Sequence, residues 1–283
     1  MKKEIELHVH PFLGRNTLGD VVEAMCKREL DIVALEALDA SLYPLVLEEA
    51  KKLYSDATRD YAGVKLPDGK WLLNGCEYKT KEGLHILTVG WARDEANSQT
   101  EIRKIIDEGL EQDALVILDH PFVDNGVTRT AGHISAKQEL FLEELCKEYS
   151  GNVALEWNAY CLPWVRFGLK VILNLLGQQT DYYDVNRKVE ELSDRLTKDG
   201  YNEPVIADTD LHARSKDLLL DMGTSRIIVD VEGECARDIV QSMKQKIFSG
   251  DYQNVKRYVG IFHLLRAFCI PILFHNHFEK PRA

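Results

Sequence analysis

The sequence predicts a single α/β domain built around a barrel-like sheet. Short apolar runs alternate with longer segments of helical period along almost all of the 283 residues. This repeated β-α order is typical of a parallel sheet with helices outside it. No Gly-rich phosphate loop follows the first apolar run, so a dinucleotide-binding fold is not indicated. No run rich in Pro, Gly or Ser divides the chain into two domains.

Eight short apolar segments are predicted as strands. Several carry Val, Ile and Leu at consecutive positions, which is typical of strands that are buried on both faces. The predicted strands are Ile5–His10, Ile32–Leu38, Trp71–Lys79, Leu84–Trp91, Leu115–His120, Val153–Asn158, Val205–Thr209 and Ile227–Val231.

The helical segments lie between these strands and several have recognisable ends. Thr17 and Asp184 precede two of them as N-caps. Gly151, Gly200 and Gly250 follow three others, as left-handed C-terminal caps require. The predicted helices are Leu18–Arg28, Leu42–Tyr54, Glu101–Glu111, Lys137–Tyr149, Val185–Lys198, Lys216–Met222 and Glu234–Phe248.

Composition and charge narrow the class of protein. The net charge of -11, from 35 Lys and Arg against 46 Asp and Glu, argues against an anionic-membrane partner and against nucleic acid beyond short ends. Six scattered cysteines without a C-x-x-C pair, and no export signal, predict reduced thiols and a cytoplasmic protein. The stretch Val259–Phe274 is too broken to span a bilayer and is predicted as a buried C-terminal helix ending near Pro271.

The histidines carry the first indication of chemistry. His8 and His10 close the first predicted strand, and residues i and i+2 of a strand point to the same face. Both imidazoles therefore project together at the carboxyl end of the strand, which is where a barrel carries its active site. Two converging neutral imidazoles form half of a site for an ion such as Zn, Fe or Mn.

Polar side chains that can bind metal also lie at the end of nearly every other strand. Because these positions correspond from strand to strand, chance scatter is a poor explanation. The segments are Gly75-Cys76-Glu77, Gly83-Leu84-His85, Asp119-His120-Pro121, Glu156-Trp157-Asn158 and Thr209-Asp210-Leu211-His212.

In this order, H-x-H, G-x-E with a following G-x-H, D-H-P, E-x-N and T-D-x-H resemble the motifs of the PHP family of metal-dependent phosphoesterases. That family includes small-molecule phosphatases and the PHP domains attached to bacterial DNA polymerases. The similarity runs from about residue 4 to residue 250. It implies a distorted seven-stranded TIM-like β/α barrel over residues 1–250, with a metal site at the C-terminal ends of the strands. Residues 251–283 are predicted to form a helical extension packed on the barrel.

The resemblance also implies two divalent metal ions. The ligands of the first ion would be His8, His10, Glu77 and Asp210. Glu77 would bridge to a second ion, held also by His85 and His120. Mixed His and carboxylate ligands suit Zn, Mn or Fe better than Ca or Mg alone. A carboxylate that bridges two dications holds them roughly 3.5–4 Å apart, and water between them loses its proton near neutral pH.

Members of the family often carry a third ion, and this chain departs from the pattern there. Arg15 stands near the expected acid of the first loop, and Leu38 stands where a histidine of a T-D-H element is expected. Of the expected third set only His212 remains, so at most two ions are predicted. Arg15 is then predicted to grip the substrate phosphate, and His212 to protonate the leaving oxygen. The alternative for Arg15 is a salt bridge to Glu36.

Three further residues are candidates for supporting roles. Glu156 and Asn158 are predicted to orient metal ligands from behind, and ordinary hydrogen bonding at a strand end is the alternative. His133 lies in the polar loop that follows the His120 strand and is predicted to contact substrate.

The leading hypothesis is therefore a metal-dependent phosphoric ester hydrolase that acts on a small phosphorylated metabolite, with a monoester favoured. One alternative is a nuclease or nucleotide phosphatase, as among the polymerase-linked relatives. Another is a non-catalytic metal-binding relative with a regulatory role, because the third set of ligands is missing.

Overall fold

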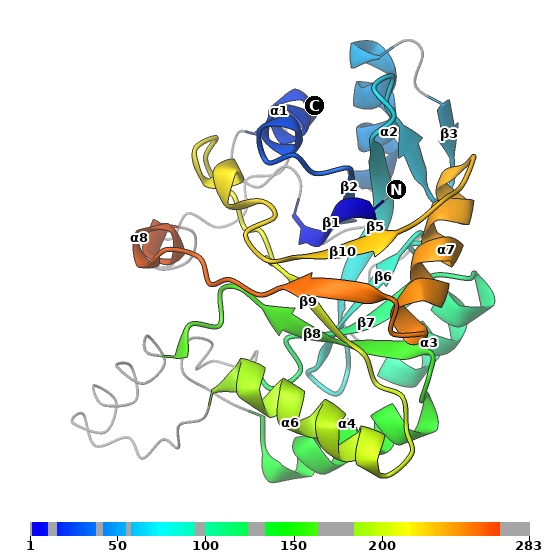
Figure 1. Ribbon diagram of the computed structural model, residues 1–283, viewed down its shortest axis with the longest axis vertical. Coiled ribbons are helices and arrows are strands. Elements are labelled where there is room, and N and C mark those ends of the chain that lie inside the picture. Colours follow the sequence, from blue (N-terminus) through cyan, green and yellow to red (C-terminus); the bar gives the residue numbers. More distant parts are fainter. Residues whose placement is uncertain are drawn as a thin grey trace.

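The computed structural model describes residues 2–10, 16–37, 42–54, 58–93, 100–123, 134–163 and 184–266. There, one mixed sheet curls into an almost closed barrel, with helices around its outside (Figure 1). The strands are β1 (Lys2–Val9), β2 (Ile32–Ala37), β3 (Thr58–Asp60), β4 (Gly63–Lys65), β5 (Trp71–Lys79), β6 (His85–Val89), β7 (Leu115–Asp119), β8 (Val153–Asn158), β9 (Val205–Asp208), β10 (Arg226–Asp230) and β11 (Tyr252–Val255). The helices are α1 (Leu18–Lys27), α2 (Leu42–Leu53), α3 (Ile102–Glu111), α4 (Ala136–Glu148), α6 (Val185–Lys198), the 3-10 helix η1 (Leu218–Asp221), α7 (Ala236–Phe248) and α8 (Ile261–Leu264).

Backbone and side-chain hydrogen bonds bring the two ends of the sheet together. Nine strands follow the order β11-β10-β1-β2-β5-β6-β7-β8-β9, and β3 and β4 branch from β5. Beyond β9, Leu211 donates its N–H to the His8 carbonyl at 2.8 Å, and His10 donates to the Leu211 carbonyl at 3.1 Å. At the other end of β9, the side chain of Asn254 in β11 bonds to the backbone of Val205 and Ala207. These contacts connect β9 to β11 along the strand and to β1 just beyond its end, so they link the two edges of the sheet.

The predicted parallel sheet is confirmed for part of the barrel and wrong for the rest. β1, β2 and β5 run parallel, as do β7, β8 and β9. However, β6 is antiparallel to both of its neighbours, and β10 is antiparallel to β1 and β11. Residues 80–84 are too short for the crossover that parallel strands need, so β5 and β6 form a hairpin. The described residues contain eleven strands rather than the expected seven.

The individual elements match the predictions closely, with exceptions near the C-terminus. All eight predicted strands are present, and the caps at Thr17 and Asp184 each accept a backbone N–H. The predicted helix Lys216–Met222 is a short 3-10 turn, η1. Residues 252–255, expected in a helical extension, pair with β10 as β11. The described part of the predicted buried helix Val259–Phe274 is only the short α8, where Phe262 is 77% exposed.

The interior of the barrel changes from apolar to polar along its strands. The part below the strand-end polar residues, toward the amino ends of the parallel strands, is filled by fully buried apolar side chains. Among them are Leu7, Ala34, Leu73, Ile117, Ala154 and Ile206. In four of these strands the residue two positions further on the same face is an acid: Glu36, Asp119, Glu156 and Asp208. The apolar residues thus form a packed floor under a polar layer at the carboxyl ends of the strands. No helix of the described residues is both long and apolar enough to cross a membrane.

Candidate metal centre

A bulge in β1 aims the first pair of histidines into the barrel. Glu6 pairs with Val33 of β2 but Val9 pairs with Leu35, so the register shifts between Glu6 and Val9. An extra residue of this kind re-aims the side chains that follow it. As a result His8 and His10 both face the interior, and neither is more than 2% exposed. The prediction that the two imidazoles share a face is confirmed.

The first group of candidate ligands is His8, His10 and Asp210. The two Nε2 atoms lie 3.0 Å apart, and Asp210 Oδ1 lies 3.3 Å from His8 Nε2 and 3.4 Å from His10 Nε2. Asp210 Oδ1 is buried and accepts no hydrogen bond in proper geometry from the described residues. Two ring nitrogens and a carboxylate oxygen that converge in this way match the donor set of a divalent ion.

The second group lies where β5 and β7 end and the antiparallel β6 begins, so His85 stands at the start of its strand and not at the predicted C-terminal end. His85 Nδ1 contacts Glu77 Oε1, and His120 Nε2 lies 3.8 Å from the same oxygen. The rings of His85 and His120 have centroids 4.9 Å apart. Together with Asp119 these side chains offer ligand atoms that all lie within 4.8 Å of one another.

Glu77 joins the two groups. Its Oε1 faces His85 and His120, whereas its Oε2 lies 3.3 Å from His10 Nε2. Burial alone would raise the pKa of Glu77, but the neighbouring His85, His10 and His8 hold that pKa well below its usual range. One ionised carboxylate thus presents an oxygen to each set of histidines, as the predicted bridging role requires.

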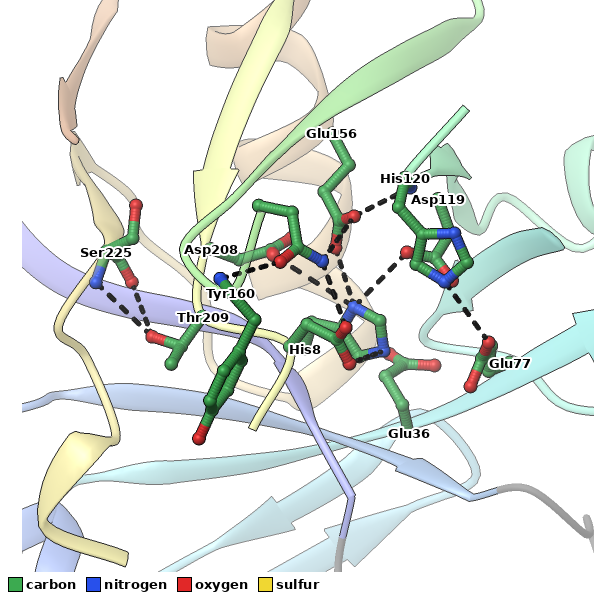
Figure 2. Close-up of polar contacts among 12 residues, drawn as sticks. His8, Glu36, Glu77, Asp119, His120, Glu156, Tyr160, Asp208, Thr209 and Ser225 are labelled. Atoms are coloured by element: carbon green, nitrogen blue, oxygen red, sulfur yellow. Dashed lines mark hydrogen bonds and ion pairs between the residues drawn. The ribbon is translucent and has the colours of Figure 1, made fainter. Parts of the chain in front are cut away.

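Glu156 and Asn158 hold the first group from behind. Glu156 Oε1 lies 2.7 Å from His8 Nδ1, and Oε2 accepts the backbone N–H of His120 at 2.7 Å. Asn158 donates to Glu156 Oε2 and to Asp210 Oδ2, both at 3.0 Å. Figure 2 shows Glu156 between His8 and the backbone of His120. These contacts agree with the predicted orienting role, because they connect Glu156 and Asn158 to candidate metal ligands on other strands.

The backbone is strained at two of the candidate ligands. His120 has a φ of 26° and Asp210 a φ of 56°, in the region that side chains other than glycine seldom adopt. The turn at Asp210 is held from below by Glu6, whose carboxylate accepts the N–H groups of Thr209 and Gly223 at 2.9 Å each. Such strain persists only where its surroundings fix it, and it is found most often at functional sites.

The electrostatics of the site are dominated by buried acids around His8. Burial alone would lower the pKa of His8, but the charges of Asp210 and Glu156 raise it to about 10. Burial raises the pKa values of Asp119 and Asp208 well above their usual range, and the adjacent Glu156 raises both further. The cluster thus contains both ionised acids and acids that retain a proton, and a bound cation would favour the ionised form of the latter.

The remaining predicted residues divide into one that the structure places and two that it does not. His212 lies beside the first group, with its ring centroid 4.2 Å from that of His10 and its Nδ1 3.0 Å from Asp210 Oδ1. Arg15 and His133 lie outside the described residues. Their substrate contacts, and the alternative pairing of Arg15 with Glu36, stay predictions.

The structure adds buried acids that the strand-end motifs did not identify as site residues. Asp119, Asp208 and Glu36 are each 0% exposed and point into the barrel beside His8 (Figure 2). A sequence signal existed for each, because each lies two residues beyond an apolar residue of the inner face. Gly75 of the G-x-E motif makes room for one of them, since a Cβ there would lie 2.1 Å from Glu36 Oε1.

Comparison with solved structures identifies the fold. A two-domain protein of Bacteroides vulgatus, described as containing a predicted PHP-like metal-dependent phosphoesterase, aligns with a TM-score of 0.53 at 14% identity, over 95% of this chain and 70% of that one. The chain has a PHP-like fold. PsfC from Pseudomonas syringae shares it, with a TM-score of 0.56 at 13% identity, over 97% and 98% of the two chains.

The same PHP-like fold occurs in an endonuclease. The lesion-specific endonuclease PfuEndoQ of Pyrococcus furiosus aligns with a TM-score of 0.53 at 15% identity over 90% of this chain. This chain spans 58% of the length of that enzyme. Neither a protein-family model nor a curated protein matches the sequence. At these identities the comparisons establish the fold, and activity has to be argued from the site.

Proposed function

We propose that this chain is a metal-dependent phosphoesterase in which two divalent ions share the carboxylate of Glu77. The observation that carries the proposal is the placement of Glu77 between His10 on one side and His85 with His120 on the other. The proposed ligands are His8, His10, Asp210 and Glu77 for one ion, and Glu77, His85 and His120 for the other. His and carboxylate donors of this kind suit Zn, Mn or Fe.

Neighbouring residues fix which ring nitrogen of His8 and of His10 faces the proposed ion. His8 Nδ1 lies against Glu156, and His10 Nδ1 lies 3.0 Å from the Glu36 carbonyl. Each contact uses the Nδ1 proton and leaves Nε2 free to bind metal, as is general for ligating histidines. When bound, two such ions activate a water molecule near neutral pH and neutralise charge on the phosphoryl oxygens.

His212 is proposed to donate the proton that the leaving oxygen needs. Burial opposes its protonation, but the adjacent Asp210 raises the pKa of His212, so the ring keeps a proton closer to neutral pH. Its side chain is 17% exposed, so it is open to the mouth of the barrel. Arg15 is proposed to grip the substrate phosphate, and His133 to contact the substrate.

A small phosphorylated metabolite, with a monoester favoured, is the first candidate substrate. The chain's net charge of -11 opposes a long polyanion. A phosphodiester in nucleic acid is the second candidate, because PfuEndoQ has a related fold, and an endonuclease Q was solved with a 27-mer duplex carrying an abasic lesion at its active site.

Three substrates separate these possibilities. Protein loaded with Mn²⁺ is assayed on p-nitrophenyl phosphate, on bis-p-nitrophenyl phosphate and on a duplex oligonucleotide with an abasic site. We expect the monoester to be hydrolysed fastest, and His8→Ala to lower that rate by about 10³-fold or more, since metal chemistry supplies several kcal/mol. His263→Ala, a histidine paired with Asp221 outside the site, is the matched control and should retain activity.

Each possible failure has its own interpretation. Faster cleavage of the duplex would replace the metabolite hypothesis with the nuclease hypothesis. Equal inactivity of metal-loaded and chelated protein on all three substrates would leave the regulatory, non-catalytic hypothesis.

A further inference from the structure

The side chain of Asp119 lies between His8 of the first proposed ion site and His120 of the second. Asp119 opens the D-H-P motif, but the family resemblance assigns it no role. We propose that Asp119 is a fourth protein ligand of the second ion, alongside Glu77, His85 and His120. This inference rests on the proposed function, because it concerns the composition of one of its two metal sites.

The geometry places Asp119 Oδ2 among the proposed ligands of the second ion. It lies 2.9 Å from His120 Nε2 and 3.7 Å from His85 Nδ1, and Glu77 Oε1 is 3.8 Å from the same His120 nitrogen. Ligands about 2.0–2.2 Å from a tetrahedral ion are separated from one another by roughly 3.3–3.6 Å. The two distances from Asp119 Oδ2 lie just below and just above this range, so all four donors can face one ion.

Hydrogen bonds from N–H donors do not account for this position, and the side chain that shares a hydrogen bond with Asp119, Glu156, is itself an acid. Asp119 is 0% exposed, and neither of its oxygens accepts a hydrogen bond in proper geometry from the described residues. The contact with His120 Nε2 is short but lacks the angle of a hydrogen bond. A ring nitrogen and a carboxylate oxygen that lie close without being aimed at each other are arranged like two ligands of a common cation. A buried acid without N–H donors can become a carboxylate at low cost only where a cation balances its charge.

The assignment also makes the two ion sites alike. The first would have two histidines, Asp210 as its own carboxylate and Glu77 as the shared one. With Asp119, the second ion likewise has two histidines, a carboxylate of its own and the shared Glu77. Three carboxylates then face the four positive charges of two dications, where two would face them without Asp119.

A role for Asp119 as a charge partner of His8 would give a different result when Asp119 is replaced. Its Oδ1 lies 3.5 Å from His8 Nδ1, and Figure 2 shows it beside both His8 and His120. If Asp119 served only as a charge partner of His8, its removal would weaken the first ion, because His8 belongs to that group. The number and the identity of the ions lost therefore distinguish the two roles.

The test compares Asp119→Asn with Asp208→Asn in the full chain. Asp208 is the matched comparison because it is equally buried and lies 4.0 Å from the same His8 nitrogen, but it groups with His8 and Glu156 rather than with His85 and His120. Each metal-free protein is titrated with Mn²⁺, bound metal is counted by mass spectrometry, and electron paramagnetic resonance distinguishes paired from single Mn²⁺. Circular dichroism confirms that each variant is folded.

We expect two ions and a paired signal for the unchanged chain and for Asp208→Asn. Asp119→Asn should keep one ion, give the signal of single Mn²⁺ and bind the second ion at least about 10–100-fold more weakly. Wild-type affinity for both ions in Asp119→Asn, loss of its first ion, or an equal loss in Asp208→Asn would overturn the inference and leave the proposed function standing. Fewer than two ions in the unchanged chain would overturn both.

A second measurement does not depend on the variant folding. In a crystal structure of the unchanged chain grown with Mn²⁺ or Zn²⁺, an Asp119 oxygen should lie about 2.0–2.2 Å from the second ion. A carboxylate more than about 3 Å from that ion would refute the assignment.

Discussion

Histidines approach several buried carboxylates at one end of the barrel, and none approaches the buried carboxylate at the other end that the structure describes. At the carboxyl ends of the strands, Glu77, Glu156 and Asp210 are almost fully buried but lie within hydrogen-bonding or ion-pair distance of histidines and of Asn158. At the opposite end, Glu203 precedes β9, is 1% exposed, and neither of its oxygens has a hydrogen-bond partner in the described chain.

The pKa values of the two ends differ for the same reason. At the mouth, the neighbouring His8 lowers the pKa of Glu156 to about 2 even though burial opposes this. At the opposite end, burial raises the pKa of Glu203 to about 8, and the nearby Ser150 hydroxyl offsets only part of that effect. Burial therefore leaves an acid ionised only where a histidine pairs with it closely, and the pKa values of Asp119 and Asp208 at the mouth are also raised.

Removal of the metal ions should have the largest effect on stability and activity. The effect should depend on the acids at the mouth of the barrel and not on Glu203. Ions that bind the native state at 1,000 times their dissociation constant stabilise it by about 4 kcal/mol, so chelation should lower the melting temperature by several degrees and abolish hydrolysis. Differential scanning calorimetry with and without added Mn²⁺ measures the shift. Glu203→Gln should show the same metal-dependent shift as the unchanged chain. Equal melting temperatures with and without metal would contradict a metal centre.

Glu77→Gln should give the next largest effect, because the amide cannot bridge two ions as a carboxylate does. We expect loss of at least one bound ion and a fall of about 10³-fold in kcat/KM, an effect of several kcal/mol. Metal analysis and steady-state kinetics measure the two changes. Glu203→Gln, the same substitution in a buried acid at the other end, should keep both ions and full activity. An unchanged metal content in Glu77→Gln would remove the argument for a shared carboxylate.

Asn158→Ala should have an intermediate effect. The variant loses the amide that donates to both Glu156 and Asp210, so the ligands of the first ion become less well oriented. Loss of such supporting contacts typically weakens metal binding by about 10–100-fold. Isothermal titration with Mn²⁺ measures the change. Asn254→Ala, which removes an amide bridging backbone groups of β9 away from the site, should lower stability but not metal affinity.

The sequence predicted most of the elements and much of the candidate site. Period-two alternation indicated that His8 and His10 share a face, because that signal is local. The grouping of these histidines with Glu77 and Asp210 was implied by the resemblance to the PHP family. The direction of β6 was missed, although the short link 80–84 indicated a hairpin. β11 was missed because its sequence, Tyr252–Val255, is polar and pairs only at the seam of the barrel.

The buried acids were harder to predict. Asp119 and Asp208 each lie two residues beyond an apolar residue of the inner face, so alternation indicates which way they face but not which ligands they come close to. Their placement depends on the register of β7 and β9 with their neighbours, which arises only when the barrel closes. A sequence therefore identifies the histidines of such a site more readily than the carboxylates that surround them.

Glu203→Gln should have the smallest effect and a pH dependence of known sign. The folded-state pKa of about 8 lies above the ordinary value of 4.5, so between these values the native state holds a proton that the unfolded state has lost. The stability of the unchanged chain should therefore fall as pH rises through this window, by up to about 1.4 kcal/mol per pH unit from this group. Glutamine has no such proton, so the variant should lack this part of the slope and become the more stable protein toward pH 8. Urea unfolding at pH 6, 7 and 8 measures the slopes, and parallel curves for the two proteins would show that the Glu203 carboxylate is solvated in the native state.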